Sequence, residues 1–245
     1  MIKRLKYYWG ISLFTLFFLP FTITLGFWQL DRADQKQDLQ RSLTALEHPI
    51  TVAQGQGPEL SVLKDFQRVT LNSRFIKPFM WFKDNQVVMG KVGYDAIGLI
   101  RQGTQLLLVN RGWFASQGQR DPLPVIDWVN GNVALTGRLV PVQPNPYQLG
   151  VDVYTNQYPQ LVQGIVPAQL APHIGTSMDG ALLPWVLMLD TPGEATLTPH
   201  WLASSMTPDK HLAYAWQWFG LALTLSILYI YRVFYSPTDT KKVDS

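Results

Sequence analysis

His211 is the residue whose type and position most directly suggest chemistry. In the stretch "HLAYAWQWFG" (211–220), Tyr214, Ala215 and Trp218 fall on the same side of a helix as His211, because residues three, four and seven apart share one helical face. Neutral imidazole is a good axial ligand of haem iron, and flat rings can wall a porphyrin. The alternative is an aromatic belt at a membrane surface with a solvated histidine. Residue types alone leave both interpretations open and favour the belt.

A second polar group occurs in "LGFWQLDR" (25–32). Gln29 and Arg32 are three residues apart, so they lie on roughly one face of a helix, and Arg32 could neutralise a haem propionate. Gly26 permits the close approach of another helix or a ligand. Trp28 fits an interfacial belt.

The stretch "LLLVNRGWF" (106–114) ends a buried strand with a permanent cation beside a glycine and a large ring. One interpretation pairs Arg111 with a carboxylate at the end of a sheet and places Gly112 in a β-bulge. The other is an anionic or partner-binding patch. The residue types favour the bulge.

The sequence lacks the common hydrolase motifs, so no catalytic residue is predicted. The sequence has no G-x-S-x-G elbow and no H-E-x-x-H helix. Ser177 lies near His173 and Asp179, but we interpret this stretch as a glycine-rich loop. Cysteine is absent, which excludes disulfides, C-x-x-C redox chemistry and covalent haem attachment.

Two uncharged apolar runs, 9–30 and 212–231, are each long enough to cross a bilayer, which needs about 20 helical residues. The first run exceeds the apolar region of a signal peptide and lacks a small-x-small cleavage site, so we expect an uncleaved anchor. Basic residues flank both runs at the chain ends, which predicts cytoplasmic termini. The expected segments are a basic tail 1–8, a span 9–30, an extracytoplasmic domain 31–210, a span 211–231 and a tail 232–245. Because the spans are antiparallel, Gln29 and Arg32 should lie level with His211.

The segment between the spans is close to neutral and has no basic stripe, so nucleic-acid binding is not expected. Its apolar alternation predicts a mostly antiparallel β (α+β) domain on a two-helix transmembrane hairpin. We expect a helical continuation over 31–48, a short helix at 167–175 and a strand at 183–190. Three hairpins are predicted. In the first, the alternating segment 66–76 leads into 80–90, whose centre at 83–85 is a turn signal. The second pairs 94–100 with 105–114, and the third pairs 125–129 with 132–140, joined by Asn130-Gly131.

The chain resembles the surfeit-locus family of cytochrome oxidase assembly factors. The resemblance rests on "LGFWQLDR" (25–32), "VGYDAIG" (92–98) with "LLLVNRGWF" (106–114), and "HLAYAWQWFGLAL" (211–223). The order of these motifs, the two spans and the length all match, so the resemblance covers essentially the whole chain. It implies a non-enzymatic factor that helps to deliver or hold haem a for the catalytic subunit of the oxidase. A bacterial inner membrane and a periplasmic domain are expected, with lipid, the catalytic subunit and haem a synthase as candidate partners.

The resemblance also implies roles for individual residues. The family's proposed haem-ligand histidine matches His211, and its Trp, Gln and Arg cluster matches Trp28, Gln29 and Arg32. The predicted haem site comprises His211, Tyr214, Trp218, Gln29 and Arg32. The predicted partner-binding residues are Trp28, Gly93, Tyr94, Asn110, Arg111, Gly112 and Trp113. Two alternatives stay open: a protein scaffold that binds no haem, and a membrane-anchored enzyme.

Overall fold

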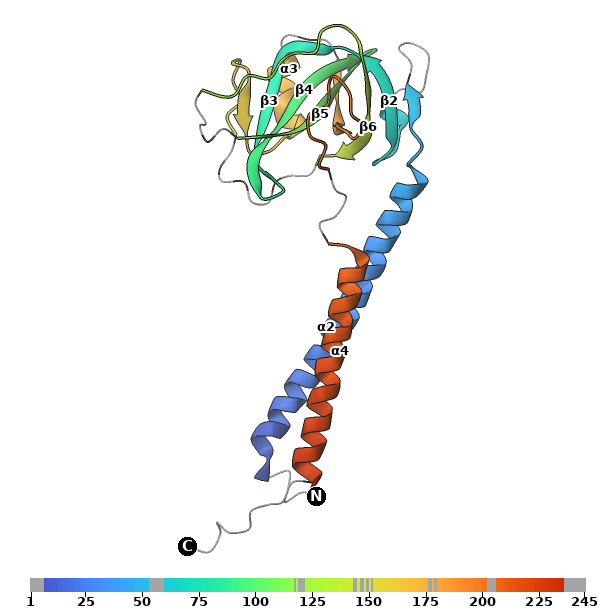
Figure 1. Ribbon diagram of the computed structural model, residues 1–245, viewed down its shortest axis with the longest axis vertical. Coiled ribbons are helices and arrows are strands. Elements are labelled where there is room, and N and C mark those ends of the chain that lie inside the picture. The colour runs from blue at the N-terminus through green and yellow to red at the C-terminus, as the bar shows by residue number, and fades with distance from the viewer. Residues whose placement is uncertain are drawn as a thin grey trace, which may run out of the picture. The chain divides into compact units, whose positions relative to one another are not determined.

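The chain forms two compact units. One contains residues 1–42 and 203–245, and the other contains residues 43–202. A computed structural model describes residues 7–52, 60–116, 118, 122–142, 145, 148, 150, 152–175, 178, 180–201 and 206–235. We call the first unit the helix unit and the second the sheet domain (Figure 1).

The helix unit consists of α2 (Trp9–Ala45) and α4 (Pro208–Ile230), and α4 continues into a π-helical turn, Tyr231–Tyr235. Both helices are long and apolar enough to cross a membrane, so the two helices predicted as spans are present as candidate membrane helices. α2 passes Pro20 and the polar residues after Leu30 without a break, so the predicted helical continuation is present and ends at Ala45.

Small side chains form the contact between these helices, which we call the helix seam. Its buried residues are Thr15, Thr22, Gly26 and Ala33 of α2, and His211, Ala215 and Ala222 of α4. Small residues let helices pack closely in lipid, where packing replaces the hydrophobic effect as the driving force. Gly26 is the tightest point, because an added Cβ would lie 2.5 Å from the ring of Phe219.

The sheet domain is built on one eight-stranded mixed sheet in the order β1-β2-β6-β8-β5-β4-β3-β7. Its strands are β1 (Ile50–Val52), β2 (Arg68–Ser73), β3 (Phe75–Val88), β4 (Lys91–Gln102), β5 (Gln105–Ala115), β6 (Val133–Pro141), β7 (Gln160–Val162) and β8 (Ala181–Leu189). The pairings β2–β6, β3–β4, β4–β5 and β6–β8 are antiparallel. The pairings β1–β2, β3–β7 and β5–β8 are parallel. The predicted mostly antiparallel α+β class is therefore confirmed.

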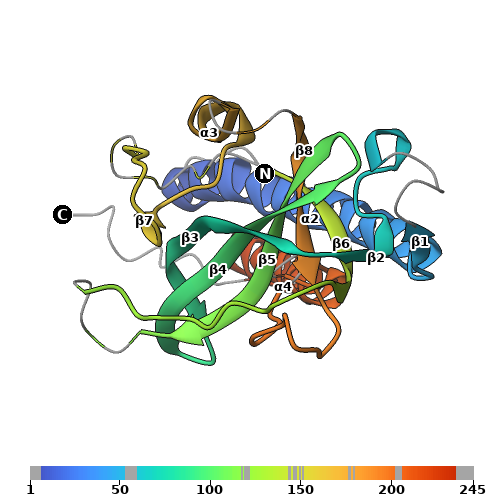
Figure 2. The same cartoon turned by 90° about the horizontal axis from the view of Figure 1, so that it is seen from above.

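The core lies on both faces of this sheet. Alternate residues of β5 point to opposite sides: Leu107 and Val109 belong to one apolar cluster, and Leu106 and Leu108 to the other. The short helix α3 (Pro167–Gly175) lies against the second face (Figure 2). It contributes Leu170 to that cluster. A strand buried on both faces reads as a continuous apolar run, which is what "LLLV" shows.

Two of the three predicted hairpins are wrong, because turn residues in the sequence did not indicate which strands pair. The predicted turn at 83–85 lies inside β3, where Asn85 has a φ of 57° and the register shifts between Lys83 and Gln86. Asparagine tolerates this φ in turns and bulges alike, so its presence does not distinguish them. The residues predicted to form the first arm belong to β2 and the start of β3, and β2 pairs with β6.

The predicted third hairpin is also wrong. Residues 125–129 form no strand, and β6 pairs with β2 and β8. Gly131 does have a φ of 78°, so the turn signal was sound, but distant strands occupy both edges of β6. The hairpin of β4 and β5, the strand β8 and the helix α3 are confirmed.

Arg138 joins the two ends of the chain within the sheet domain. Its Nη2 donates to Glu47 Oε2 at 2.6 Å and its Nη1 donates to the carbonyl of Phe66 at 2.9 Å. The guanidinium also lies 5.9 Å from the ring centroid of Trp201. Glu47 follows α2 and Trp201 precedes α4 by seven positions. The chain therefore enters and leaves the sheet domain beside the same buried cation.

We predict that Arg138→Met destabilises the sheet domain, because the buried carbonyl of Phe66 and the ring of Trp201 lose their cationic partner. The free energy of unfolding should fall by about 1–3 kcal/mol, which lowers the Tm of the detergent-solubilised chain by several degrees. Tryptophan fluorescence during heating measures it. Arg41→Met is the matched control, because its pair with Asp38 at 3.2 Å is exposed and such pairs contribute little. Equal Tm values for the two variants would contradict the prediction.

Candidate functional site

His211 lies in the first turn of α4 and faces the helix seam. Thr207 is the N-cap and Pro208 opens the helix, as expected from the sequence, although the Thr207 side chain makes no capping hydrogen bond. His211 is only 7 % exposed. Its Nδ1 lies 2.7 Å from Oε1 of Gln29 on α2. The structure thus pairs two residues that are 182 positions apart in the chain.

This hydrogen bond determines which nitrogen of the imidazole carries the proton. An amide oxygen only accepts hydrogen bonds, so Nδ1 donates to Gln29 and the lone pair of the neutral ring resides on Nε2. No residue within the described parts of the chain forms a hydrogen bond with Nε2. Histidines that ligate metals are commonly held in this way, with the second ring nitrogen bound to a neighbouring acceptor. His211 therefore has the tautomer and the fixed orientation of a potential ligand.

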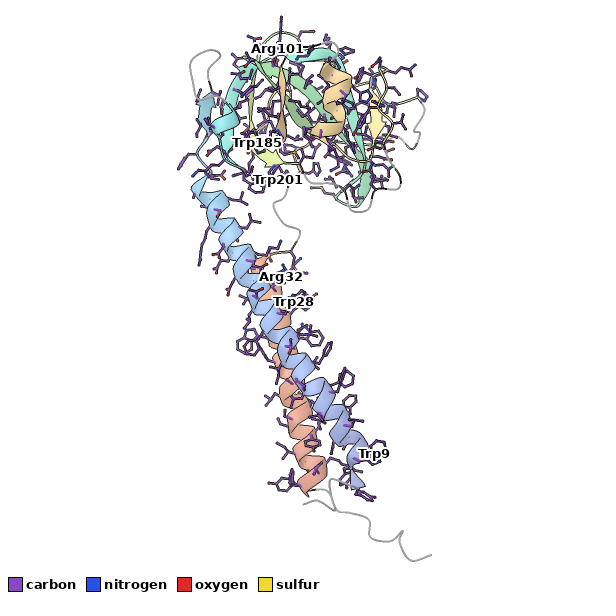
Figure 3. The ribbon with its side chains drawn as sticks, turned by 180° about the vertical axis from the view of Figure 1, so that it is seen from behind. Trp9, Trp28, Arg32, Arg101, Trp185 and Trp201 are labelled. Carbon is purple, nitrogen blue, oxygen red and sulfur yellow. The ribbon has the colours of Figure 1, made fainter. Side chains whose placement is uncertain are left out.

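Arg32 lies outside the seam, next to Trp28. Its guanidinium is 5.6 Å from the ring centroid of Trp28, and its Nη1 donates to Gln35 Oε1 at 2.9 Å. Gln35 in turn donates to Asp31 at 2.7 Å. Trp28 and Arg32 lie next to each other along α2 (Figure 3). Of the two polar residues predicted to meet His211, only Gln29 contacts it.

The aromatic residues of α4 flank the seam. Trp218 is half-buried and Tyr214 is exposed. Along each helix the angular position about the axis increases by about 100° per residue. Counted in this way, Tyr214 on α4 and Arg32 on α2 each lie at an angle roughly 80–100° smaller than that of the seam residues on the same helix. In an antiparallel pair of right-handed helices, these two offsets fall on the same side. His211, Trp218, Tyr214 and Arg32 therefore follow one side of the helix pair.

The sheet domain contains a β-bulge at the "NRGW" motif. Asn110 pairs with Ile97 and Trp113 pairs with Asp95, so two residues of β5 oppose one residue of β4. Gly112 has a φ of 112°. An added Cβ there would lie 2.7 Å from the carbonyl oxygen of Thr198. The predicted bulge is present, and it requires glycine.

The residues around the bulge are buried, and they fix the segment that leads towards α4. Arg111 donates its Nε to the carbonyl of Ala195 at 2.9 Å and its Nη1 to the carbonyl of Asp127 at 3.1 Å, so its partners are carbonyls instead of a side-chain carboxylate. Burial lowers the pKa of Arg111, and Asp127 opposes this shift. The backbone N–H of Trp113 donates to the Thr198 carbonyl at 2.8 Å.

Gly93 and Tyr94 complete this buried group on β4. An added Cβ at Gly93 would lie 2.5 Å from the ring of Trp113, and the Tyr94 hydroxyl lies 3.3 Å from Ser116 Oγ. A partner-binding role for these residues stays a prediction. Because their side chains point inward, any partner would contact the surface that they support.

Sequence reasoning missed a buried polar pair beside the bulge. Asp95 is buried, and its Oδ2 accepts a hydrogen bond from Asn110 Nδ2 at 2.9 Å. Its Oδ1 lies 3.3 Å from Nε2 of His200. Burial raises the pKa of Asp95, while His200, Asn110 and Lys83 act in the opposite direction. The available signal was an acidic residue inside the apolar strand "YDAIGLI".

The enzyme hypothesis gains no geometry from the described residues. Ser177 and Asp179 lie outside them, and the ring of His173 packs 5.5 Å from that of Tyr154. The spacing S-x-x-K, in which some enzymes place a serine nucleophile near a lysine, is found at residues 61–64. The side chain of Ser61 also lies outside the described part of the chain. Within the described parts, no three His, Cys, Asp or Glu residues form a group that could hold a metal ion.

We predict that Asp95→Asn is neutral or stabilising at neutral pH. A carboxyl whose pKa is raised in the folded state opposes folding above that pKa, because the unfolded chain solvates the charge better. This cost is absent below the ordinary value of 3.8 and grows as the pH rises through the folded pKa. Any advantage of Asp95→Asn in urea unfolding should therefore vanish as the pH falls towards 4.

Asp95→Ala is the comparison variant, because it leaves the buried amide of Asn110 without an acceptor. It should lose about 1–3 kcal/mol of unfolding free energy. If Asp95→Asn is clearly less stable than wild type at neutral pH, an ionised pair with His200 outweighs burial and the prediction is wrong.

Comparison with known proteins agrees with these motifs. A search of curated proteins finds no significant match. The model of the SURF1 family matches residues 16–223. This match covers most of α2 and α4, the bulge and the His211–Gln29 pair. The chain therefore belongs to the SURF1 family, a family of cytochrome oxidase assembly factors.

Proposed function

We propose that this protein holds haem a transiently at His211 while the catalytic subunit of a haem–copper cytochrome oxidase is assembled. Family membership supports the general role in oxidase assembly. The observation that carries the finer proposal is the hydrogen bond between His211 Nδ1 and Gln29 Oε1. It orients a buried imidazole so that the lone pair of the neutral ring lies on Nε2, in the first turn of a candidate membrane helix.

The residues on this side of the helix pair fit a porphyrin as cargo. His211 offers a neutral nitrogen donor, which is a standard axial ligand of haem iron. Trp218 and Tyr214 supply flat apolar surface, and Arg32 supplies a permanent cation for a propionate. Haem brings its own redox chemistry, whereas the chain's residues bind it, orient it and hold its charge. Such a site suits transfer of haem better than catalysis, and we infer that the protein is not an enzyme.

The position of His211 also fits the amphipathic shape of haem. His211 immediately precedes the uncharged run 212–231, while Asp209 and Lys210 lie on its polar side. A porphyrin at this level would place its ring towards lipid and its propionates towards water. An ionisable residue at a membrane margin is a candidate functional residue by default.

The proposed setting is a bacterial inner membrane, with both termini in the cytoplasm and the sheet domain in the periplasm. The basic residues at both chain ends support this orientation. The catalytic subunit is the proposed recipient, and haem a synthase is the proposed donor. The alternative is a scaffold that binds the catalytic subunit without haem.

We predict that His211→Ala and Gln29→Leu both reduce oxidase assembly in cells that lack their own copy of the protein. The first variant removes the ligand. The second removes the acceptor that orients it, and loss of such a partner lowers metal affinity roughly 10–100-fold. The absorption of haem a near about 600 nm, a property of the cofactor itself, measures assembled oxidase in membranes.

His48→Ala is the matched control, because His48 is an exposed histidine outside the helix seam. It should support wild-type oxidase content. Immunoblots must show equal amounts of all three variants in the membrane. If His211→Ala restores full oxidase content, haem ligation by His211 is refuted and the scaffold alternative is favoured.

A further inference from the structure

The turn between β3 and β4 exposes apolar side chains, and none of them belongs to the proposed haem site. Val88 pairs with Lys91 across a two-residue loop of Met89 and Gly90. Met89 is 97 % exposed, Val87 is 62 % exposed and Val92 is 54 % exposed. We call Val87–Val92 the hairpin tip.

Met89, at the apex of the turn, adopts a backbone conformation that is unusual for its residue type. Met89 has a φ of 49° and Gly90 a φ of 75°. A two-residue turn with both φ values positive favours Asn, Asp or Gly in its first position, and other residues adopt a positive φ uncommonly. Asparagine would therefore satisfy the turn better than Met89. A residue that breaks a local rule and also exposes an apolar side chain indicates a role other than folding.

The hairpin tip lies at the end of the sheet domain where the chain leaves towards α4. Trp113 Nε1 donates to the carbonyl of Gln86, at the base of the tip, at 3.0 Å. Trp113 also pairs with Thr198, three residues before Trp201. Within the sheet domain, Trp201 and Arg101 lie at opposite ends (Figure 3). Since β4 runs from Lys91 to Gln102, its first residue is at the Trp201 end.

A short tether connects this end of the sheet domain to α4. Trp201 and Pro208 are separated by residues 202–207. Seven Cα–Cα steps span at most about 25 Å. The apolar run of α4 begins only four residues after Pro208. The end that carries the hairpin tip is therefore the end from which the chain returns, over a short segment, to the apolar run of α4.

The charge of the hairpin tip suits an anionic lipid surface. Lys91 is exposed, and the sequence from 85 to 94 contains no Asp or Glu. Lysine beside exposed apolar residues binds membrane surfaces through headgroup attraction and shallow insertion. The first acidic residues on either side, Asp84 and Asp95, are buried.

We propose that the hairpin tip is a third membrane contact of this protein, in addition to its two spans. Met89 enters the boundary between headgroups and acyl chains, Val87 and Val92 follow at its sides, and Lys91 meets lipid phosphates. The contact anchors the hairpin tip in the headgroup region. It is independent of whether His211 binds haem.

The absence of cysteine permits a direct test on the full chain. Met89→Cys and Val153→Cys are each labelled with a nitroxide and reconstituted into vesicles of phosphatidylcholine and phosphatidylglycerol. Val153 is the matched control, because it is 78 % exposed on a loop distant in sequence from the tip. The label at 89 should collide severalfold more often with oxygen, relative to a water-soluble nickel chelate, than the label at 153. Equal collision ratios at the two positions would overturn the proposal.

A second variant separates lipid contact from folding. Met89→Asn suits the positive φ of the turn, so it should keep the Tm of the chain while lowering the lipid exposure of a label at Val92→Cys. Unchanged lipid exposure at position 92 would overturn the proposal. Spin–spin broadening between labels at 89 would identify contact with a second copy instead. Immobilisation that requires added oxidase subunit would identify a protein-binding surface, and either result would also overturn it.

Discussion

The hydrogen bond between His211 and Gln29 joins the two helices of the helix unit near the start of α4, and a second bond, from the Tyr229 hydroxyl to Ser12 Oγ at 3.1 Å, joins them near its end. In hydrocarbon a polar side chain without a partner is costly, so a histidine and a glutamine at the margin of two spans stabilise each other only where the helices bring them together. The small seam residues, above all Gly26 with its contact to Phe219, permit that approach. The two bonds together fix the relative register of α2 and α4, and the bond to Gln29 also places the proton on Nδ1 of the His211 ring. The same arrangement leaves Nε2 as the atom with coordinating capacity.

The sheet domain uses its polar residues differently, because they hold backbone segments in place. Arg138 binds Glu47 and lies near Trp201. Arg111 and Trp113 bind Ala195 and Thr198, which precede the chain's return to α4. A permanent cation that satisfies several carbonyls can be buried at acceptable cost. These contacts therefore hold the backbone of the sheet domain at the positions where its two connections to the helices begin.

The sequence allowed the spans, the β4–β5 hairpin and the role of glycine at position 112 to be predicted, because each depends on neighbours along the chain. It also placed Gln29 level with His211, since antiparallel spans of similar length leave little freedom. The strand order could not be predicted in the same way. Asn85 and Gly131 both adopt positive φ values, but distant strands decide how the chain pairs on either side of each residue. The pair of Asp95 with His200 likewise joins segments whose proximity no local pattern encodes.

The central claim is that His211 ligates haem iron, and an absorption spectrum of the purified protein tests it most directly. The full chain, made in cells that synthesise haem a and purified in detergent, should show a haem Soret band and α-band. Those bands should disappear in His211→Ala and persist in His48→Ala. A colourless wild-type protein, or a His211→Ala protein with an unchanged haem spectrum, would contradict the claim.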